Sequence, residues 1–253
     1  MLNQDRLIVA LDVSSATQAR QIVQSIGESA TTYKVGKQLF TAEGPQIVRD
    51  LVASGRKVFL DLKFHDIPNT VAGAVTEAAK LEVSMLTVHA SGGSKMLKAA
   101  AEAAAQSPAK PMILAVTVLT SLSDADLTEL GISGPVQSQV LRLGSLARAA
   151  GCGGLVASAH EARELRRELG TDFAIVTPGI RPTQNDVGAP SFSPSVCEKG
   201  GLKTDDQARI LTPKEAIAAG ATYLVVGRPI LEAPSPAQAA AAIVNEIGQG
   251  IGA

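Results

Sequence analysis

The sequence predicts an α/β protein whose single domain is a (β/α)8 barrel of the TIM type. Three observations support this: short apolar runs alternate strictly with helical stretches, the alternation repeats eight times, and the chain has the ~250 residues typical of such a barrel. Strict alternation of strands and helices implies a parallel sheet. Because no proline-rich linker divides the chain, residues 1–253 are expected to form one domain. An open doubly wound sheet would give the same alternation and is the alternative fold.

The expected strands are short apolar runs, most of them apolar throughout, as in strands buried on both faces of a sheet. Along the chain they cover residues 7–11, 32–35, 57–60, 85–88, 112–116, 154–157, 174–176 and 223–226. The helices that follow them are expected at residues 16–26, 45–53, 70–81, 94–105, 135–150, 160–169, 213–219 and 236–247. Helix-start residues support two of these, since Ser15 precedes the first helix and Thr212-Pro213 begins the seventh.

One stretch, residues 183–206, fits neither pattern. It is rich in Gly, Pro, Ser and Asp, and we interpret it as a long loop insertion within the barrel. Loops of this length inside compact domains are uncommon and tend to be functional lids or disordered segments. The stretch follows the seventh expected strand, where barrels often build a phosphate site.

Composition and charge narrow the class of protein. A hydrophobic content of 45% and a charged content of 19% are those of a globular chain. The net charge of −1 gives no electrostatic reason to expect binding to nucleic acid or to a membrane. No apolar run reaches the ~20 residues of a membrane-spanning helix, and the amino terminus lacks a signal-peptide pattern, so a cytoplasmic protein is expected. Cys152, Cys197 and the three histidines show no metal-binding or redox spacing, so we expect no metal site and idle thiols.

Polar residues end several of the apolar strands, at the edge where barrels place their active sites. Asp12 ends the first strand and Lys34 the second, and Asp61, Lys63 and Asp66 follow the third. On a regular strand, Asp61 and Lys63 would point to the same side. Two carboxylates beside one ammonium group keep a lysine charged and fix its position, which makes it a candidate proton donor. A structural ion-pair network at the rim of the barrel is the alternative interpretation.

A second candidate site follows the seventh and eighth strands. Gly227-Arg228 forms a strand-to-helix turn that would bring backbone N–H groups and a guanidinium together, a combination that suits a phosphate. Arg181, after the seventh strand, is a candidate partner. The alternative is a glycine turn beside a solvated arginine. Neither G-x-G-x-x-G nor a P-loop motif is present, so no nucleotide cofactor is expected.

The ten residues DLKFHDIPNT, from Asp61 to Thr70, resemble the signature of the orotidine 5′-phosphate decarboxylase family in its bacterial branch. Further matching blocks occur in order along almost the whole chain, at residues 10–12, 34–36, 88–93, 115–121, 177–182 and 226–230. The resemblance implies a barrel enzyme that decarboxylates orotidine 5′-monophosphate to uridine 5′-monophosphate, the last step of de novo pyrimidine nucleotide biosynthesis. It also implies that the enzyme uses no cofactor and forms a homodimer.

The resemblance further implies roles for individual residues. Lys63 would deliver a proton to the ring carbon that loses carbon dioxide, and Asp61 would lie beside the substrate carboxylate. Asp66 and Thr70 would be contributed across the dimer interface to the neighbouring site. The other substrate-binding positions, which contact ribose, pyrimidine or phosphate, would be Asp12, Lys34, Thr120, Arg181, Gln207, Gly227 and Arg228.

The chain departs from the family pattern at one place. Family members usually run from the Arg-Pro pair to an Asp-Gln pair through a short loop, whereas here Asp206-Gln207 follows Arg181-Pro182 only after the 183–206 insertion. The assignment of Gln207 to the phosphate site is therefore weaker than that of Arg228.

Two other functions fit parts of the pattern. Sugar-phosphate decarboxylases and hexulose-phosphate synthases carry a D-x-K-x-x-D motif on a similar barrel but use a magnesium ion and an enediolate. Residues 67–70 and Thr120 argue against them. A non-catalytic protein that binds a phosphate ligand is the third possibility, because fold does not determine function. Such a protein would have no reason to retain Asp61, Lys63 and Asp66 together.

Overall fold

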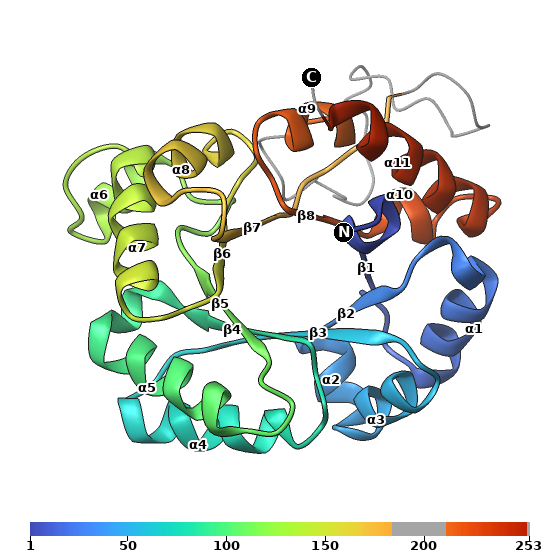
Figure 1. Ribbon diagram of the computed structural model, residues 1–253, viewed down its shortest axis with the longest axis horizontal. Coiled ribbons are helices and arrows are strands. Elements are labelled where there is room, and N and C mark those ends of the chain that lie inside the picture. The colour runs from blue at the N-terminus through green and yellow to red at the C-terminus, as the bar shows by residue number, and fades with distance from the viewer. Residues whose placement is uncertain (184–210, 252–253) are drawn as a thin grey trace, which may run out of the picture.

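The computed structural model describes residues 1–183 and 211–251, which form a closed barrel of parallel strands surrounded by helices (Figure 1). The strands follow one another around the barrel in chain order, and the last pairs with the first. They are β1 (Leu7–Ala10), β2 (Thr32–Gly36), β3 (Lys57–Phe64), β4 (Met85–His89), β5 (Met112–Val116), β6 (Gly154–Val156), β7 (Ala174–Thr177) and β8 (Tyr223–Val226). The ring of pairings confirms the expected (β/α)8 barrel, because an open doubly wound sheet would leave two unpaired edges.

All eight expected helices are present, with small differences at their ends. They are α1 (Ala16–Ile26), α3 (Gln46–Ala53), α4 (Pro68–Ala79), α5 (Gly93–Gln106), α7 (Val136–Ala149), α8 (Ala162–Leu169), α9 (Pro213–Ala218) and α11 (Pro236–Gly250). Short helices that the sequence did not predict are α2 (Lys37–Glu43), α6 (Asp124–Glu129), α10 (Arg228–Leu231) and the 3-10 turns η1 (Asn3–Arg6), η2 (Gly27–Ser29) and η3 (Ala90–Gly92). They are too short for a hydrophobic period to be recognised.

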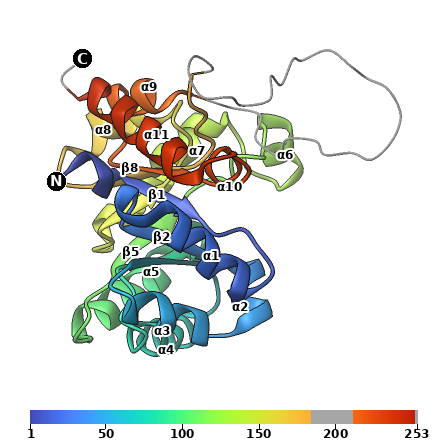
Figure 2. The same ribbon diagram turned by 90° about the vertical axis from the view of Figure 1, so that its right-hand side faces the viewer.

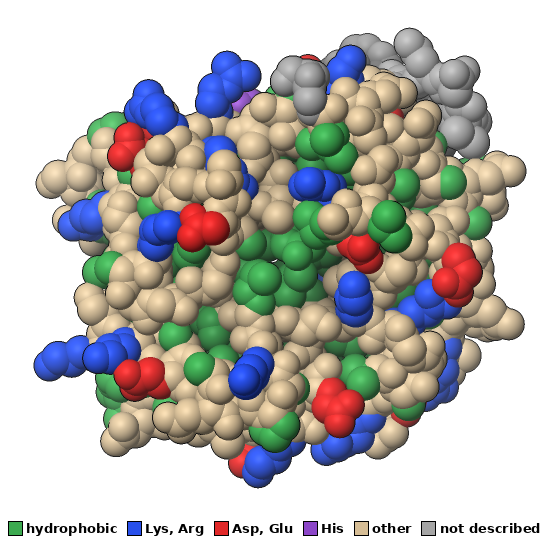
Figure 3. All heavy atoms as spheres, viewed as in Figure 1, with side chains coloured by type: hydrophobic (Ala, Val, Ile, Leu, Met, Phe, Trp, Pro, Cys, Tyr) green, Lys and Arg blue, Asp and Glu red, His purple; other side chains and the backbone are tan. Residues whose placement is uncertain are grey.

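Apolar side chains pack on both sides of the strands. The larger core lies between the barrel and its helices, and a smaller cluster fills the barrel interior. The interior cluster consists of Ile8, Ala10, Phe59, Met85, Leu114, Val176 and Val225. Seen from the side of the molecule shown in Figure 1, hydrophobic side chains occupy the centre and charged side chains surround them (Figure 3). The barrel is thus a packed core and not an open channel.

The two ends of the barrel differ in the segments that they carry. Helices α6 and α10, which follow the carboxyl ends of β5 and β8, lie on the opposite side of the barrel from the amino terminus (Figure 2). In barrels of this class the active site lies at the end where the strands terminate.

Arg166 in α8 joins the loops at the other end of the barrel. Its guanidinium donates hydrogen bonds to the carbonyl oxygens of Gly220 (3.1 and 2.7 Å), Gly170 (2.7 Å) and Phe173 (2.8 Å). It also donates to the hydroxyl of Thr222 at 2.9 Å. These bonds tie α8 to the segments that lead into β7 and β8.

We expect Arg166→Ala to lower the free energy of unfolding by about 2–4 kcal/mol, because several partly buried carbonyl oxygens lose their donor at once. The matched control is Arg167→Ala, since the Arg167 side chain is 71% exposed and its ion pairs among the described residues are with Glu164 and Glu168 of the same helix. That change should alter stability by less than about 0.5 kcal/mol. Urea denaturation measures both, and equal stabilities would contradict the role given to Arg166.

The expected loop insertion at residues 183–206 lies outside the described residues except for Thr183, and so do Cys197 and Gln207. The segments that flank it meet in a parallel bridge between Ile180 and Leu211, where the amide of Arg181 donates to the Leu211 carbonyl at 3.1 Å. In the part of the chain that the structure describes, none of the helices has both the length and the apolar character needed to span a membrane.

Cys152 lies in the apolar core between the barrel and its helices. Burial raises the pKa of its thiol to about 12, so the thiolate is not populated near neutral pH. This agrees with the interpretation of Cys152 as an idle thiol.

Candidate active site

A cavity of about 290 Å³ lies at the ends of the strands and contains most of the predicted site residues. Those that line it are Asp12, Lys34, Asp61, Lys63, Thr120, Arg181, Gly227 and Arg228. The remaining wall is largely apolar and includes Phe59, Val118, Leu119 and Ile180. Polar groups from widely separated parts of the sequence therefore converge on one apolar-walled space, as in a small-molecule binding site.

Strand β3 supplies the centre of this cavity and is longer and less regular than the sequence predicted. It was expected to end at residue 60 but continues to Phe64. Its register against β4 shifts between Leu60 and Phe64, and Lys63 has a left-handed backbone with φ 56°. The prediction for Asp61 and Lys63 assumed a regular strand, on which both side chains would point to the same side. Strand β3 is not regular at these residues. A bulge of this kind redirects side chains and is common near active sites.

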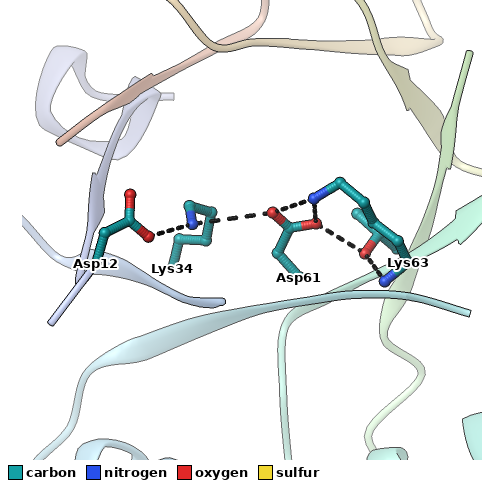
Figure 4. A network of polar contacts seen from close by, with 5 residues as sticks. Asp12, Lys34, Asp61 and Lys63 are labelled. Atoms are coloured by element: carbon teal, nitrogen blue, oxygen red, sulfur yellow. Dashed lines mark hydrogen bonds and ion pairs between the residues drawn. The ribbon is translucent and has the colours of Figure 1, made fainter. Parts of the chain in front are cut away.

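The charged residues form a continuous network across the cavity (Figure 4). The amine of Lys63 lies 2.7 and 2.8 Å from the two carboxylate oxygens of Asp61. On the other side of Asp61, the amine of Lys34 lies 3.9 Å from Oδ2 of Asp61 and 2.8 Å from Oδ1 of Asp12. Negative and positive groups therefore alternate from Asp12 to Lys63.

The inner part of the network is shielded from solvent. The side chains of Lys34 and Asp61 are each 12% exposed, whereas that of Asp12 is 56% exposed. Attraction between charges is stronger where water is excluded. The amine of Lys63 is thus held at a defined point by Asp61, while it still faces the cavity.

The side chain of His89 lies at the edge of the charged network, at the end of β4. Burial lowers the pKa of its imidazole, and electrostatic repulsion from His65, Lys37 and Lys63 lowers this pKa further. The rings of His65 and His89 lie 5.4 Å apart. His89 is therefore neutral near pH 7 and adds no positive charge beside Lys63.

Thr87 of β4 belongs to this network but was not predicted. Its hydroxyl accepts a hydrogen bond from the backbone N–H of Lys63 at 2.8 Å and donates one to Oδ1 of Asp61 at 3.0 Å. Thr87 is fully buried. The sequence signal that could have identified Thr87 is its polar side chain inside the otherwise apolar run 85–88.

Two predicted residues, Asp66 and Thr70, lie apart from the cavity. Both are exposed, Asp66 in the loop after β3 and Thr70 in α4. The carboxylate of Asp66 accepts a hydrogen bond from the amide of Ile67 at 2.6 Å, and Ile67 itself is 67% exposed. Among the described residues, Lys63 forms an ion pair with Asp61 but not with Asp66 of the same chain. The expected pair of carboxylates around Lys63 is thus not formed within one chain.

The predicted phosphate residues lie on another wall of the cavity. Gly227 precedes the short helix α10 and Arg228 begins it, while Arg181 lies in the segment after β7. Gln207, the remaining candidate for this site, is outside the described residues. The cavity therefore has a guanidinium wall from β7 and β8 and a lysine–carboxylate wall from β1, β2 and β3.

The described residues hold no group of three or more histidine, cysteine or acidic side chains that could together bind a metal ion. Among the residues that the structure describes, Lys34, Lys63, Arg181 and Arg228 bring positive charge to the cavity wall.

Comparison with known proteins supplies the family. The family model described as "Orotidine 5'-phosphate decarboxylase / HUMPS family" matches residues 5–243. The chain is 48% identical over 244 residues to an orotidine 5′-phosphate decarboxylase of Idiomarina loihiensis, an alignment that covers 96% of this chain and 98% of that protein. It is 49% identical to one of Syntrophotalea carbinolica, with 96% and 94% of the two chains covered.

A solved structure agrees with the sequence relatives. The crystal structure of orotidine 5′-phosphate decarboxylase from Lactobacillus acidophilus superposes with a TM-score of 0.81 at 38% identity, covering 96% of this chain and 99% of that chain. The match extends over almost the whole chain, and it includes the strands that carry the charged network. The chain therefore belongs to the orotidine 5′-phosphate decarboxylase / HUMPS family.

Proposed function

We propose that this protein decarboxylates orotidine 5′-monophosphate to uridine 5′-monophosphate, the last step of de novo pyrimidine nucleotide biosynthesis, without a metal ion or cofactor. The observation that carries the proposal is the amine of Lys63, held 2.7 and 2.8 Å from the carboxylate oxygens of Asp61 at the wall of the cavity. The family and the names of the relatives support the choice of substrate.

The proposed chemistry matches the charges at this wall. When the bond between the ring carbon and the carboxylate breaks, carbon dioxide leaves and the electron pair stays on the ring carbon. A fixed ammonium group stabilises that developing negative charge electrostatically. The amine of Lys63 then transfers its proton to the carbon and takes another from water, so that the enzyme returns to its starting state.

The carboxylate of Asp61 has two roles in this proposal. It fixes the amine of Lys63 through two short hydrogen bonds. It would also lie beside the substrate carboxylate, where two negative charges disfavour the bound substrate relative to the transition state, in which carbon dioxide is leaving. Lys34 balances part of this charge from the opposite side of Asp61.

The phosphate of the substrate fits the guanidinium wall of the cavity. Arg181 and Arg228 can form charge-assisted hydrogen bonds to phosphate oxygens, and Gly227 leaves the backbone open to a close approach. Binding energy from this distant group can position the pyrimidine ring against Lys63. Asp12 and Lys34 would then contact the ribose, and Thr120 the pyrimidine.

We expect Arg228→Ala to lower kcat/KM for orotidine 5′-monophosphate by about 10–100-fold, the loss typical of a hydrogen bond to a charged group. The same change should have little effect on orotidine, which lacks the phosphate, so initial rates with the two substrates provide an internal control. Arg20→Ala is the matched surface variant, because Arg20 is 57% exposed and pairs with Asp50. Equal losses for both substrates would show that Arg228 does not bind the phosphate.

We further propose that the active unit is a homodimer in which Asp66 and Thr70 complete the site of the partner subunit. Both residues are exposed and remain outside the cavity of their own chain. The neighbouring residue Ile67 is 67% exposed, so a dimer interface at this point would also bury an apolar side chain.

Identification of the product tests the proposed function. Purified protein incubated with orotidine 5′-monophosphate should yield uridine 5′-monophosphate and carbon dioxide in equal amounts, as measured by mass spectrometry and carbon dioxide trapping. Folded protein that forms neither product would contradict the proposal. The family description also covers a second group of enzymes, so sugar phosphates with magnesium would then be the substrates to test.

A further inference from the structure

We propose that Thr87 is a positioning residue that holds Lys63 and Asp61 in their reactive arrangement; this inference rests on the proposed function. Thr87 does not line the cavity, so it acts through the two residues that do. Its role follows from three features: its place opposite the irregular part of β3, its two hydrogen bonds, and the backbone conformation of Lys63.

The register between β3 and β4 places Thr87 opposite the bulge. Leu60 pairs with Leu86, and Phe64 pairs with Val88. Between these two pairs, β3 has the three residues 61–63, whereas β4 has one residue, Thr87. Thr87 is the single residue of β4 that faces this longer segment, which includes Asp61 and Lys63.

Both hydrogen-bonding functions of the Thr87 hydroxyl are used. One lone pair accepts from the backbone N–H of Lys63 at 2.8 Å, and the proton is donated to Oδ1 of Asp61 at 3.0 Å. The same Oδ1 also accepts from the amine of Lys63 at 2.7 Å. One buried oxygen therefore connects the backbone of the lysine to the carboxylate that orients its side chain.

The backbone of Lys63 needs such support. Its φ of 56° lies in the left-handed region, which is unfavourable for residues other than glycine and persists only where surrounding contacts hold it. Without the hydroxyl, the amide of Lys63 would lose its partner, and Asp61 would lose one of its donors. The bulge could then relax and move the amine, and a displacement of about 1 Å at a reacting group can lower the rate by about 100-fold.

The test compares Thr87→Val with Thr222→Val in steady-state assays with orotidine 5′-monophosphate. Thr222 is a matched control, because its hydroxyl also accepts a backbone N–H from the adjacent strand, that of Ile175 at 3.0 Å, but at the far end of the barrel. We expect Thr87→Val to lower kcat by about 10–100-fold and to change KM by less than about threefold, as for an interaction that matters in the transition state. Thr222→Val should keep kcat within about twofold of the unaltered protein, even if it melts at a lower temperature.

A second pair of variants covers the case in which Thr87→Val does not fold. Thr87→Ser and Thr87→Ala both remove the methyl group, but only serine retains the hydroxyl. Serine should keep most of kcat, whereas alanine should reproduce the loss. Equal kcat for the serine and alanine variants would overturn the inference, as would a loss in Thr222→Val as large as that in Thr87→Val.

Hydrogen exchange of the Lys63 amide separates this inference from the proposed function. The amide should be protected in the unaltered protein and in Thr87→Ser, and it should exchange faster in Thr87→Ala, whatever the substrate of the enzyme is. If the unaltered protein does not convert orotidine 5′-monophosphate but the exchange pattern holds, the proposed function is wrong and the positioning by Thr87 stands. Unchanged protection in Thr87→Ala would overturn the inference.

Discussion

Replacing Lys63 with alanine should lower kcat for orotidine 5′-monophosphate by about 10⁴-fold or more, since in the proposed mechanism the change removes the proton donor and an electrostatic group at once. The amine is held by both oxygens of Asp61 at the cavity wall, and no other amine lies within hydrogen-bonding distance of Asp61 among the described residues. Lys34 is 3.9 Å from the same carboxylate and pairs mainly with Asp12. Steady-state assays at high enzyme concentration would measure the loss.

Two further variants, a control at the other end of β3 and a charge-conserving change, make this test specific to the amine of Lys63. Lys57→Ala alters a lysine at the opposite end of the same strand, and it should leave kcat nearly unchanged. The Lys57 side chain is 58% exposed, and its amine lies 3.4 Å from Oδ1 of Asp5. Lys63→Arg keeps the positive charge, but a guanidinium does not release its proton at neutral pH. The arginine variant should therefore be almost as inactive as the alanine variant. A loss below about tenfold in folded Lys63→Ala would exclude Lys63 as the donor, because general acid catalysis alone contributes more than that.

Mixing two inactive variants, Lys63→Ala and Asp66→Ala, should restore activity. If Asp66 completes the site of the partner subunit, a heterodimer contains one site with both residues intact and one site that lacks both. Random exchange of subunits makes half of the dimers heterodimers, so about a quarter of the full activity is expected. Assays before and after subunit exchange would follow the recovery.

The control for this experiment is a mixture of Lys63→Ala and Asp61→Ala. These two residues contact each other within one chain, so every site in their heterodimer lacks one of them and no recovery is expected. Mass spectrometry under native conditions can verify that heterodimers form. If verified heterodimers of Lys63→Ala and Asp66→Ala stay inactive, the two residues do not serve one shared site.

Much of the fold could be predicted because its signals are local and repeated. Each strand is a short apolar run and each long helix has a hydrophobic period, so eight repeats were visible in sequence order. Their number and the chain length favoured closure into a barrel over an open doubly wound sheet. Helices α2, α6 and α10 were missed because two turns or fewer show no clear period.

The site could be predicted in its residue types but not in its geometry. Asp61 and Lys63 were recognised as charged residues that follow a buried strand, yet the bulge that brings them together depends on pairing with β4, which a single strand sequence does not reveal. Thr87 was missed for the same reason, because its importance comes from the hydroxyl that faces the bulge. The position of Asp66 was different, because the family resemblance already implied that this residue serves the neighbouring site, and the structure shows that it makes no ion pair with Lys63 of its own chain.

The most direct test of metal-independent decarboxylation is the turnover of orotidine 5′-monophosphate by protein that has been dialysed against a chelator and assayed with the chelator present. The loss of ultraviolet absorbance that accompanies decarboxylation gives the rate. We expect rapid turnover that is unaffected by the chelator and by added magnesium, because in the proposed mechanism Lys63 supplies the positive charge and the proton. Folded protein that fails to convert this substrate, or converts it only with magnesium, would contradict this mechanism.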